Sequence, residues 1–171
     1  MPISQILLPE FDHEMANTRK LLECVPDGKF DYKPHDKSMT LGQLAGHVAE
    51  IPSYGSATIL LERLDMKGDE KPFHPTSRTE ILERFDKNVA ETRAAIAGVS
   101  DEDLAKIWSF SFAGREVFSM PRIAVLRAMM LSHLIHHRAQ LGVYLRMNSV
   151  EFPGMYGPSA DEMKHWQAKS A

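Results

Sequence analysis

The chain has 171 residues, of which 43% are hydrophobic and 25% are charged, which is typical of one globular domain with a substantial core. We therefore expect a single domain over residues 1–171. The net charge is −3 and no basic run occurs, so the sequence argues against DNA or RNA as a partner. The single cysteine, Cys24, excludes an internal disulfide and a zinc site built from cysteine pairs.

The N-terminal segment MPISQILLPEFDHE meets charged residues too early to form the apolar region of a secretory signal peptide. No segment approaches the roughly 18 apolar residues that a membrane-spanning helix needs. The lone cysteine fits a reducing compartment. We therefore expect a cytoplasmic protein with no membrane partner.

Apolar residues recur at helical spacing over residues 3–25 and predict a first helix there. Residues 26–39 are rich in Pro, Gly and Asp, so a loop should follow. A second helix is predicted over residues 41–64, because Thr40 and Gln43 form a capping-box pattern ahead of an apolar run. A proline within this helix, at position 52, predicts a kink.

The second half of the chain continues the helical pattern. A polar connection precedes a third helix over residues 77–98, and a fourth helix is predicted over residues 121–146. Between them, residues 108–120 alternate aromatic and polar side chains around an Ala-Gly turn. The sequence therefore predicts an all-α fold, a four-helix bundle with a small hairpin or extended excursion before its fourth long helix.

Two histidines mark the fourth predicted helix. At about 100° per residue, His137 lies about 40° around the helix from His133 and one turn along it, so both imidazoles leave the same face. Leu126 and Met130 share this face, which should therefore point into the protein. A buried imidazole needs a partner for its free lone pair, and a metal ion supplies one.

A third histidine, His47, shares an apolar face of the second helix with Leu44 and Ile51. Taken alone, it is more simply interpreted as a core histidine that is satisfied by hydrogen bonds. Beside His133 and His137, however, it is the natural third ligand of one metal ion.

Other residues near these histidines are candidates for supporting roles. Glu50 lies one turn after His47, as a candidate base or hydrogen-bond acceptor, although a surface glutamate is an equally good interpretation. Gln140 and Tyr144 are candidates for lining a substrate pocket, and core packing explains them equally well. Arg138 points away from the pair and is expected to anchor a carboxylate from the tail or from another helix.

A di-iron bundle is the rival interpretation, because such proteins use Glu-x-x-His on two helices. The chain contains this pattern at Glu10 and His13 and again at Glu162 and His165. However, His13 lies about 160° from the inward-facing Phe11 and should point to solvent. The second pair lies on a short terminal turn, so the three-histidine site is favoured.

Three segments together carry a resemblance to a known family: MTLGQLAGHVAE (39–50), HLIHHRAQLGVYLR (133–146) and FPGMYGPSADE (152–162). They resemble the DinB/YfiT-like family of bacterial four-helix-bundle metalloproteins, and the likeness extends over nearly the whole chain. The resemblance implies a metal-binding triad of His47, His133 and His137, the same three histidines that the helical spacing indicates. One departure is Ala139, where relatives commonly have Gly, and this position does not touch the ligands.

The resemblance also implies a homodimer and, for some relatives, S-transfer or isomerisation with mycothiol, bacillithiol or glutathione. Three neutral imidazoles leave a divalent ion its full charge, so the ion would activate water or bind a thiolate. We expect zinc, nickel, iron or manganese, and a small-molecule substrate that includes a low-molecular-weight thiol. A zincin-like protease is disfavoured, because Leu134 replaces the Glu of HExxH. The alternative is a non-catalytic, stress-associated metal-binding bundle.

Overall fold

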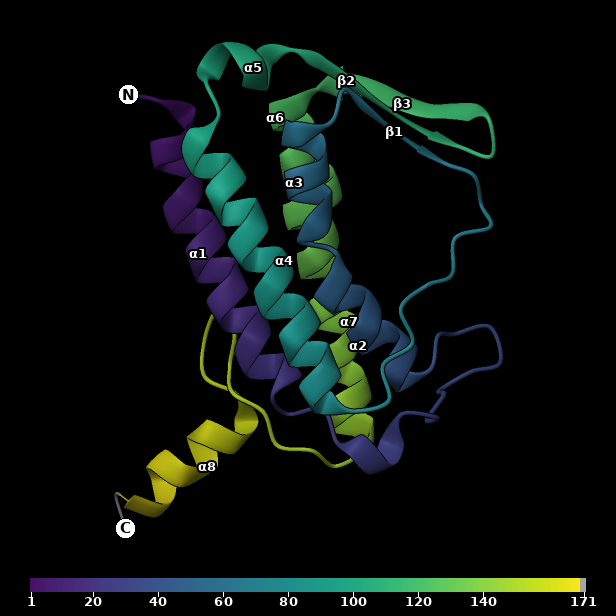
Figure 1. Cartoon of the computed structure of the whole chain (residues 1–171). Helices are drawn as coiled ribbons and strands as arrows, with labels where there is room; N and C mark the ends of the chain where they lie inside the picture. Colours follow the sequence, from purple (N-terminus) through teal and green to yellow (C-terminus); the bar gives the residue numbers. More distant parts are fainter. Residues whose placement is uncertain (170–171) are drawn as a thin grey trace.

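The computed structural model describes residues 1–169, and it describes side chains as far as residue 164. The chain is mostly helical, and its long helices lie side by side (Figure 1). These helices are α1 (Ile3–Leu22), α2 (Leu41–Glu50), α3 (Ser53–Leu60), α4 (Arg78–Gly98) and a continuous run of α6 (Arg122–Val125), the π-helical segment η2 (Leu126–Ser132) and α7 (His133–Met147).

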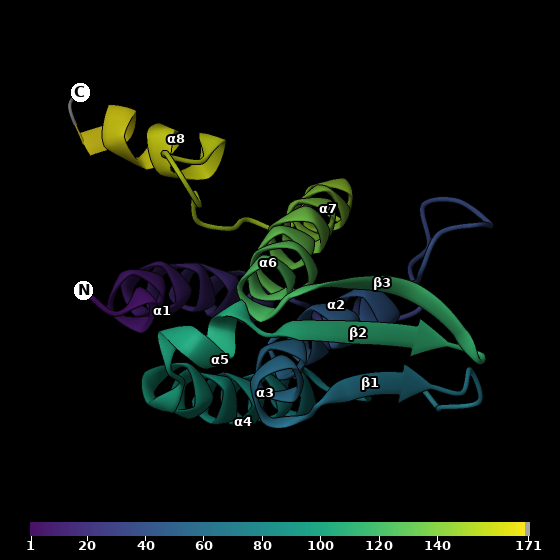
Figure 2. The same ribbon diagram turned by 90° about the horizontal axis from the view of Figure 1, so that it is seen from above.

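The shorter elements lie at the ends of this helical body. They are the 3₁₀ turn η1 (Asp27–Lys29), β1 (Arg63–Met66), α5 (Asp101–Ala105), β2 (Ile107–Phe112), β3 (Arg115–Pro121) and α8 (Ala160–Lys169). Figure 2 shows the strands side by side across one end of the helices, whereas α8 projects away from the others. None of the helices within the described residues has the length and apolar character needed to cross a lipid bilayer.

The three strands form one sheet in the order β1-β2-β3. β2 and β3 are an antiparallel hairpin, as the alternating aromatics predicted, and Ala113 and Gly114 close it with positive φ angles of 49° and 75°. β1 pairs parallel to β2, with Arg63 opposite Ser109. The all-α prediction is therefore wrong in this region, because β1 forms where the second helix was expected to continue.

The core consists of apolar side chains from the inward faces of the long helices. Phe11, Leu134 and Leu141 are fully buried, and they come from α1 and α7. Burying a side chain of this size contributes about 1.5–3 kcal/mol relative to leaving it in water. Packing of the helical faces, rather than the local helix propensity, therefore holds α7 and its histidines in place.

At the predicted kink the helix is interrupted at Ile51 and Pro52, which separate α2 from α3 although both residues keep helical dihedral angles. Two buried side chains of α4 bond to the backbone at this break. Asn88 donates to the carbonyl of Ala49 at 3.0 Å, and the hydroxyl of Thr92 donates to the carbonyl of Pro52 at 2.6 Å. The Thr92 oxygen also accepts from the N–H of Ser56 at 3.0 Å, so α4 satisfies backbone groups that the break frees.

η2 was not predicted, and it directly precedes the first histidine of α7. The N–H of His133 donates to the carbonyl of Ala128, five residues earlier, which is the π-helical pattern. π turns are rare and are frequently found at functional sites. The side chains of Leu126 and Met130 are nevertheless buried, as the sequence pattern predicted.

Arg138 is buried on the side of α7 that faces away from His133, and it connects α7 to α1 and to the segment after α7. Its guanidinium donates to the carboxylate of Glu14 on α1 at 2.6 Å and to the hydroxyl of Thr18 at 3.0 Å. It also donates to the hydroxyl of Tyr156, in the segment after α7, at 2.5 Å. The expectation that Arg138 anchors a carboxylate from another helix is therefore confirmed.

Candidate metal centre

The structure brings His47, His133 and His137 together between α2 and α7. One ring nitrogen from each residue lies within 4.8 Å of the others, and all three side chains are half-buried. The Nε2 atoms of His47 and His133 are 3.3 Å apart. Two nitrogens that bind one ion tetrahedrally at about 2.0–2.1 Å are themselves about 3.3 Å apart, so this pair has the spacing of two ligands.

The protonation of these histidines also suits a metal ion. Burial, and then the nearby His137 and His133, lower the pKa of His47 to about 4. Burial likewise lowers the pKa of His133 and of His137. All three imidazoles are therefore neutral near pH 7, which is the form that binds metal.

The ring of His133 has an unusual polar environment. Its Nδ1 atom is buried and has no hydrogen-bond partner of ordinary geometry, although the backbone of Met129, one turn earlier, favours a proton on the ring. The ring of Tyr54 stacks on it, with centroids 6.2 Å apart and planes 25° apart. Burial, and then the charge of Glu50, raises the pKa of the Tyr54 hydroxyl. Tyr54 was not among the residues predicted for the site, although the helical spacing of the sequence puts it on the same face as His47.

Gln140 holds the third histidine. The Nδ1 atom of His137 lies 2.8 Å from Oε1 of Gln140, and an amide oxygen can only accept, so Nδ1 carries the proton. This tautomer leaves the lone pair of Nε2 free for a metal ion, as is common for metal-ligating histidines. Gln140 therefore orients a candidate ligand, and its predicted role in substrate binding stays a prediction.

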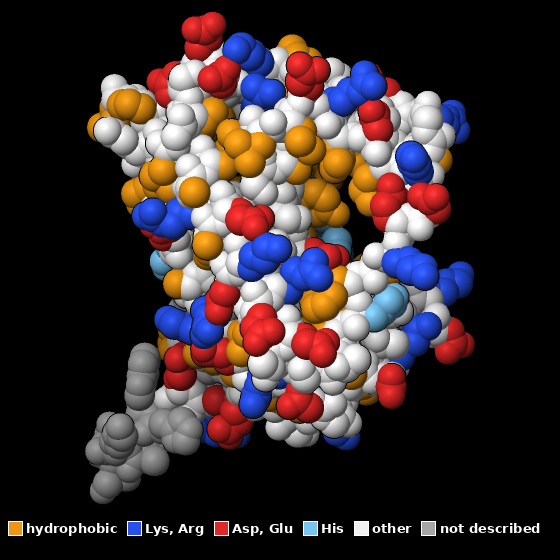
Figure 3. All heavy atoms as spheres, viewed as in Figure 1, with side chains coloured by type: hydrophobic (Ala, Val, Ile, Leu, Met, Phe, Trp, Pro, Cys, Tyr) orange, Lys and Arg blue, Asp and Glu red, His pale blue; other side chains and the backbone are white. Residues whose placement is uncertain are grey.

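A cavity of about 240 Å³ opens beside the cluster, with His47 in its wall. Figure 3 shows this face of the molecule hollowed between the helices and the connection that follows β1. The other lining residues come from α2, from the loop before it and from that connection: Met39, Gln43, Glu50, Pro72, Phe73 and His74. A small molecule in this cavity would therefore contact His47.

Glu50 lies in the cavity wall one turn after His47, so the structure places this candidate base beside the cluster. Its carboxylate is 3.5 Å from the guanidinium of Arg84, and its side chain is 31% exposed. Arg84 in turn lies over the ring of Phe73, 4.5 Å from the ring centre. Arg84 therefore links the carboxylate of Glu50 to the apolar wall of the cavity.

The hydroxyl and the ring of Tyr144 contact residues outside the histidine cluster. Its hydroxyl donates to the carbonyl of Met39 at 3.2 Å, and its ring meets that of Tyr32 edge-on at 6.1 Å. Because Met39 lines the cavity, this hydrogen bond of Tyr144 helps to hold the cavity wall in place. Its direct contact with a substrate stays a prediction.

The residues of the rival di-iron pattern lie elsewhere. Glu10 pairs with Arg127, and His13 is exposed and contacts Asn17 at 3.1 Å. Glu162 accepts N–H groups of the segment after α7, whereas the side chain of His165 lies outside the described part of the chain. Within the described residues, the three-histidine cluster is the one group that suits a metal ion.

Cys24 lies away from this cluster, near the end of α1. The side chain is half-buried, and its thiol donates to the carbonyl of Lys20 at 3.3 Å. Burial, and then the charge of Glu23, raises the pKa of the thiol. A raised pKa reduces the thiolate fraction at neutral pH, so Cys24 fits a packing role rather than that of a nucleophile.

Comparisons with known proteins identify the family of this chain. The family model described as the DinB superfamily matches residues 10–141. The uncharacterized protein YrdA of Bacillus subtilis (strain 168) is 29% identical over 157 residues, which cover 91% of this chain and 89% of that protein.

Two solved structures have the same architecture. A DinB-like protein from Bacillus cereus ATCC 10987 has a TM-score of 0.69 at 27% identity, over 91% of this chain and 98% of that chain. A DinB-like protein from Bacillus subtilis, YjoA, has a TM-score of 0.64 at 21% identity, over 86% of this chain and 95% of that chain. At this identity, the similarity to YjoA shows only that the two proteins share a fold. Because the family match spans well over half of the sequence and includes all three clustered histidines, the chain belongs to the DinB superfamily.

Proposed function

We propose that this protein is a metal-dependent enzyme that uses His47, His133 and His137 to hold one divalent ion and acts on a small electrophile. The observation that carries the proposal is the convergence of three neutral imidazoles, one of which, that of His47, lies in the wall of a cavity. The metal is zinc, nickel, iron or manganese, all of which accept imidazole ligands. The ion supplies positive charge that lowers the pKa of a thiol or a water molecule bound to it.

The protein side chains provide orientation, a proton acceptor and an apolar surface. Gln140 fixes the ring of His137, and Tyr54 stacks on the ring of His133. The carboxylate of Glu50 accepts the proton that the thiol or water loses, because it lies in the same cavity wall as His47. Phe73 and its apolar neighbours in the wall pack against the electrophile and exclude water from it.

The reaction that we favour is transfer of a low-molecular-weight thiol, of the glutathione, mycothiol or bacillithiol type, to the electrophile. A sulfur–carbon bond forms while the bond to the leaving group breaks, and the leaving group departs with the electron pair. The thiol proton passes to Glu50. Metal-assisted hydrolysis is the second candidate, since the same carboxylate can accept a proton from water.

The test is a conjugation assay on protein loaded separately with each of the four metals. Glutathione, bacillithiol and mycothiol are each offered with 1-chloro-2,4-dinitrobenzene, and conjugate formation is followed by absorbance. We expect turnover with at least one thiol, loss of turnover in His47→Ala, and a fall of about 10²-fold or more in Glu50→Gln. His74→Ala, at an exposed position of the cavity wall, is the control and should keep most of the activity.

Two negative outcomes have different meanings. Absence of conjugation with every thiol, but metal-dependent cleavage of 4-nitrophenyl acetate, replaces transfer with hydrolysis. Absence of both reactions in protein that holds one ion per chain favours the alternative, a non-catalytic metal-binding bundle.

A further inference from the structure

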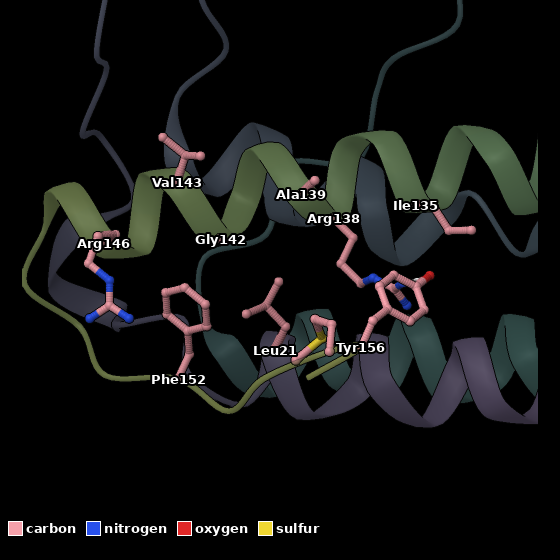
Figure 4. A pocket seen from close by; sticks show the side chains of 10 residues that line it. Leu21, Ile135, Arg138, Ala139, Gly142, Val143, Arg146, Phe152 and Tyr156 are labelled. Atoms are coloured by element: carbon pink, nitrogen blue, oxygen red, sulfur yellow. Dashed lines mark hydrogen bonds between the residues drawn. The ribbon is translucent and has the colours of Figure 1, made fainter. Parts of the chain in front are cut away.

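A second pocket, of about 390 Å³, lies on the other side of α7 from the histidine cluster (Figure 4). Gly142, in its lining, is about 180° around the helix from His133. The walls come from three segments: α7, the end of α1, and residues 150–159, which follow α7 and which we call the strap. The pocket is therefore separate from the cavity of the proposed function.

The lining of this pocket is almost entirely apolar. In Figure 4, the rings of Phe152 and Tyr156 stand on the strap and face α7, with Leu21 of α1 between them. Such a surface offers a water molecule too few hydrogen-bond partners to hold it in place. Pockets of this volume with mainly hydrophobic and aromatic walls are typical binding sites for small molecules.

The two guanidiniums that border the pocket are both neutralised. Arg138 is bonded to the buried carboxylate of Glu14 at 2.6 Å. Arg146 is bonded to both oxygens of Asp161, at 3.1 and 2.7 Å. The paired charges leave no anion-binding arginine in the lining, so the pocket favours a ligand without charge.

Polar contacts anchor the strap to α1 and to the start of α8. The hydroxyl of Tyr156 bonds to the carboxylate of Glu14 at 2.9 and 2.8 Å. One carboxylate oxygen of Glu162 accepts the N–H groups of Gly154 at 3.1 Å and Ser159 at 2.8 Å.

The turn in the strap depends on a glycine. A Cβ atom at Gly154 would lie 1.7 Å from the carbonyl oxygen of Gly157, so the turn admits no larger residue there. The turn and its polar anchors therefore hold the strap, with its aromatic side chains, beside α7.

We propose that this pocket binds a neutral, apolar organic molecule that contains an aromatic ring. The guanidiniums of Arg146 and Arg138 lie over the rings of Phe152 and Tyr156, 4.6 and 5.3 Å from the ring centres. The ring surface that these contacts leave free lines the pocket and supplies the contact with an aromatic ligand. The pocket adds a binding site to the molecule without using any residue of the histidine cluster.

The test uses the neutral fluorescent dye N-phenyl-1-naphthylamine with the full-length, metal-loaded protein. We expect saturable binding of one dye per chain. Gly142→Leu fills the pocket and should weaken dye binding by about tenfold or more. Gly142→Ala should retain binding, because its Cβ would lie at an ordinary 3.7 Å from the Phe152 ring. Gly98→Leu, at a helical glycine with open space around it, is the matched control and should bind as the unchanged protein does.

Three further readouts separate this proposal from its competitors. Metal content and conjugation activity should be the same in Gly142→Leu and the unchanged protein, because this pocket is independent of the proposed function. If Gly142→Leu does not fold, dye-induced shifts of the methyl resonances of Leu21, Val143 and Met155 in the unchanged protein replace it. Absence of saturable binding, or equal binding in Gly142→Leu, would overturn the proposal. A dimer that binds no dye and dissociates in Gly142→Leu would also overturn it and assign the pocket to a second copy of the chain.

Discussion

The Nε2 atoms of His47 and His133 are 3.3 Å apart although 86 positions separate the two residues in the sequence. The contact exists because α2 and α7 pack against each other and because each histidine interrupts an otherwise apolar face. Two ring nitrogens at this distance either share a proton or bind a common cation. The low pKa of His47 disfavours an additional proton on its ring, so the imidazole keeps the neutral form that a metal ion requires.

Single substitution of His47, His133 or His137 by Ala should abolish stoichiometric metal binding, because two remaining imidazoles hold a divalent ion far more weakly than three. Elemental analysis of each purified variant measures the metal content. Loss of metal is expected in all three variants, and retention of one ion per chain in His47→Ala would remove the third ligand from the site.

The exposed histidines provide the controls for this experiment. His13, His35 and His74 lie outside the cluster, so their Ala variants should keep their metal. The same outcome is expected for His165, a prediction that rests on the sequence alone. Metal loss in any of these variants would indicate a different ligand set.

Gln140→Ala should weaken metal binding by about tenfold or more without abolishing it, because the ring of His137 loses the acceptor that fixes its tautomer. Competition with a chromophoric chelator measures the affinity. His136→Ala is the matched control, since His136 is exposed and neighbours His137 on α7. Equal affinities for both variants would show that Gln140 has no orienting role.

The stability of the metal-free protein should fall as the pH decreases from about 6.5 to about 4. The pKa of His47 is about 4 in the folded state, against about 6.5 in the unfolded chain. Within this window the unfolded chain binds more protons, so acid favours unfolding. Burial lowers the pKa values of His133 and His137 in the same direction, which adds to the effect.

Thermal melts at pH 7.5 and 5.5 test this linkage in the presence of a chelator. We expect a lower Tm at pH 5.5, and a smaller difference between the two pH values in His47→Gln, which cannot take up the proton. A Tm that does not depend on pH over this range, or an equal shift in the variant, would contradict the prediction.

Glu14→Ala should reduce the free energy of unfolding by about 3–5 kcal/mol, because it leaves the guanidinium of Arg138 buried without its carboxylate. The side chains of this pair are only 2% and 8% exposed. The matched control is Asp12→Ala, which removes a bidentate pair with Arg93 whose side chains are 51% and 43% exposed. That change should cost far less, because water screens the exposed pair. Urea unfolding compares the two variants, and similar losses in both would show that burial does not set the strength of the pair.

The helix signals that act over a few residues were sufficient to predict much of this fold. The capping box of Thr40 and Gln43 is present in the structure, and α2 begins directly after it. Helical facing also predicted that His133 and His137 point toward His47, because burial follows the periodicity of the apolar residues.

Features that depend on distant partners could not be predicted in this way. β1 forms because its backbone pairs with β2, and RLDM carries no local pattern that favours a strand over the end of a helix. The π turn of η2 is likewise set by the packing around it, since the sequence shows an ordinary helical repeat there. The cavity wall at Phe73 depends on how a loop folds back over α2, and the polar composition of that loop gave no indication of it.

The break at Pro52 has a consequence for the timescale on which the site moves. A helix interruption is usually a place where amide hydrogens exchange rapidly with solvent, because the local structure opens easily. Here the N–H of Ser56 is bonded to the fully buried Thr92. The closely packed Gly55 leaves no room for a Cβ, which would lie 2.4 Å from the Cγ2 atom of Thr92. The amide of Ser56 should therefore exchange as slowly as those in the middle of α4. Because Asn88 of α4 also bonds to the carbonyl of Ala49, α2, which carries His47, should stay fixed relative to α4 for as long as the protein remains folded.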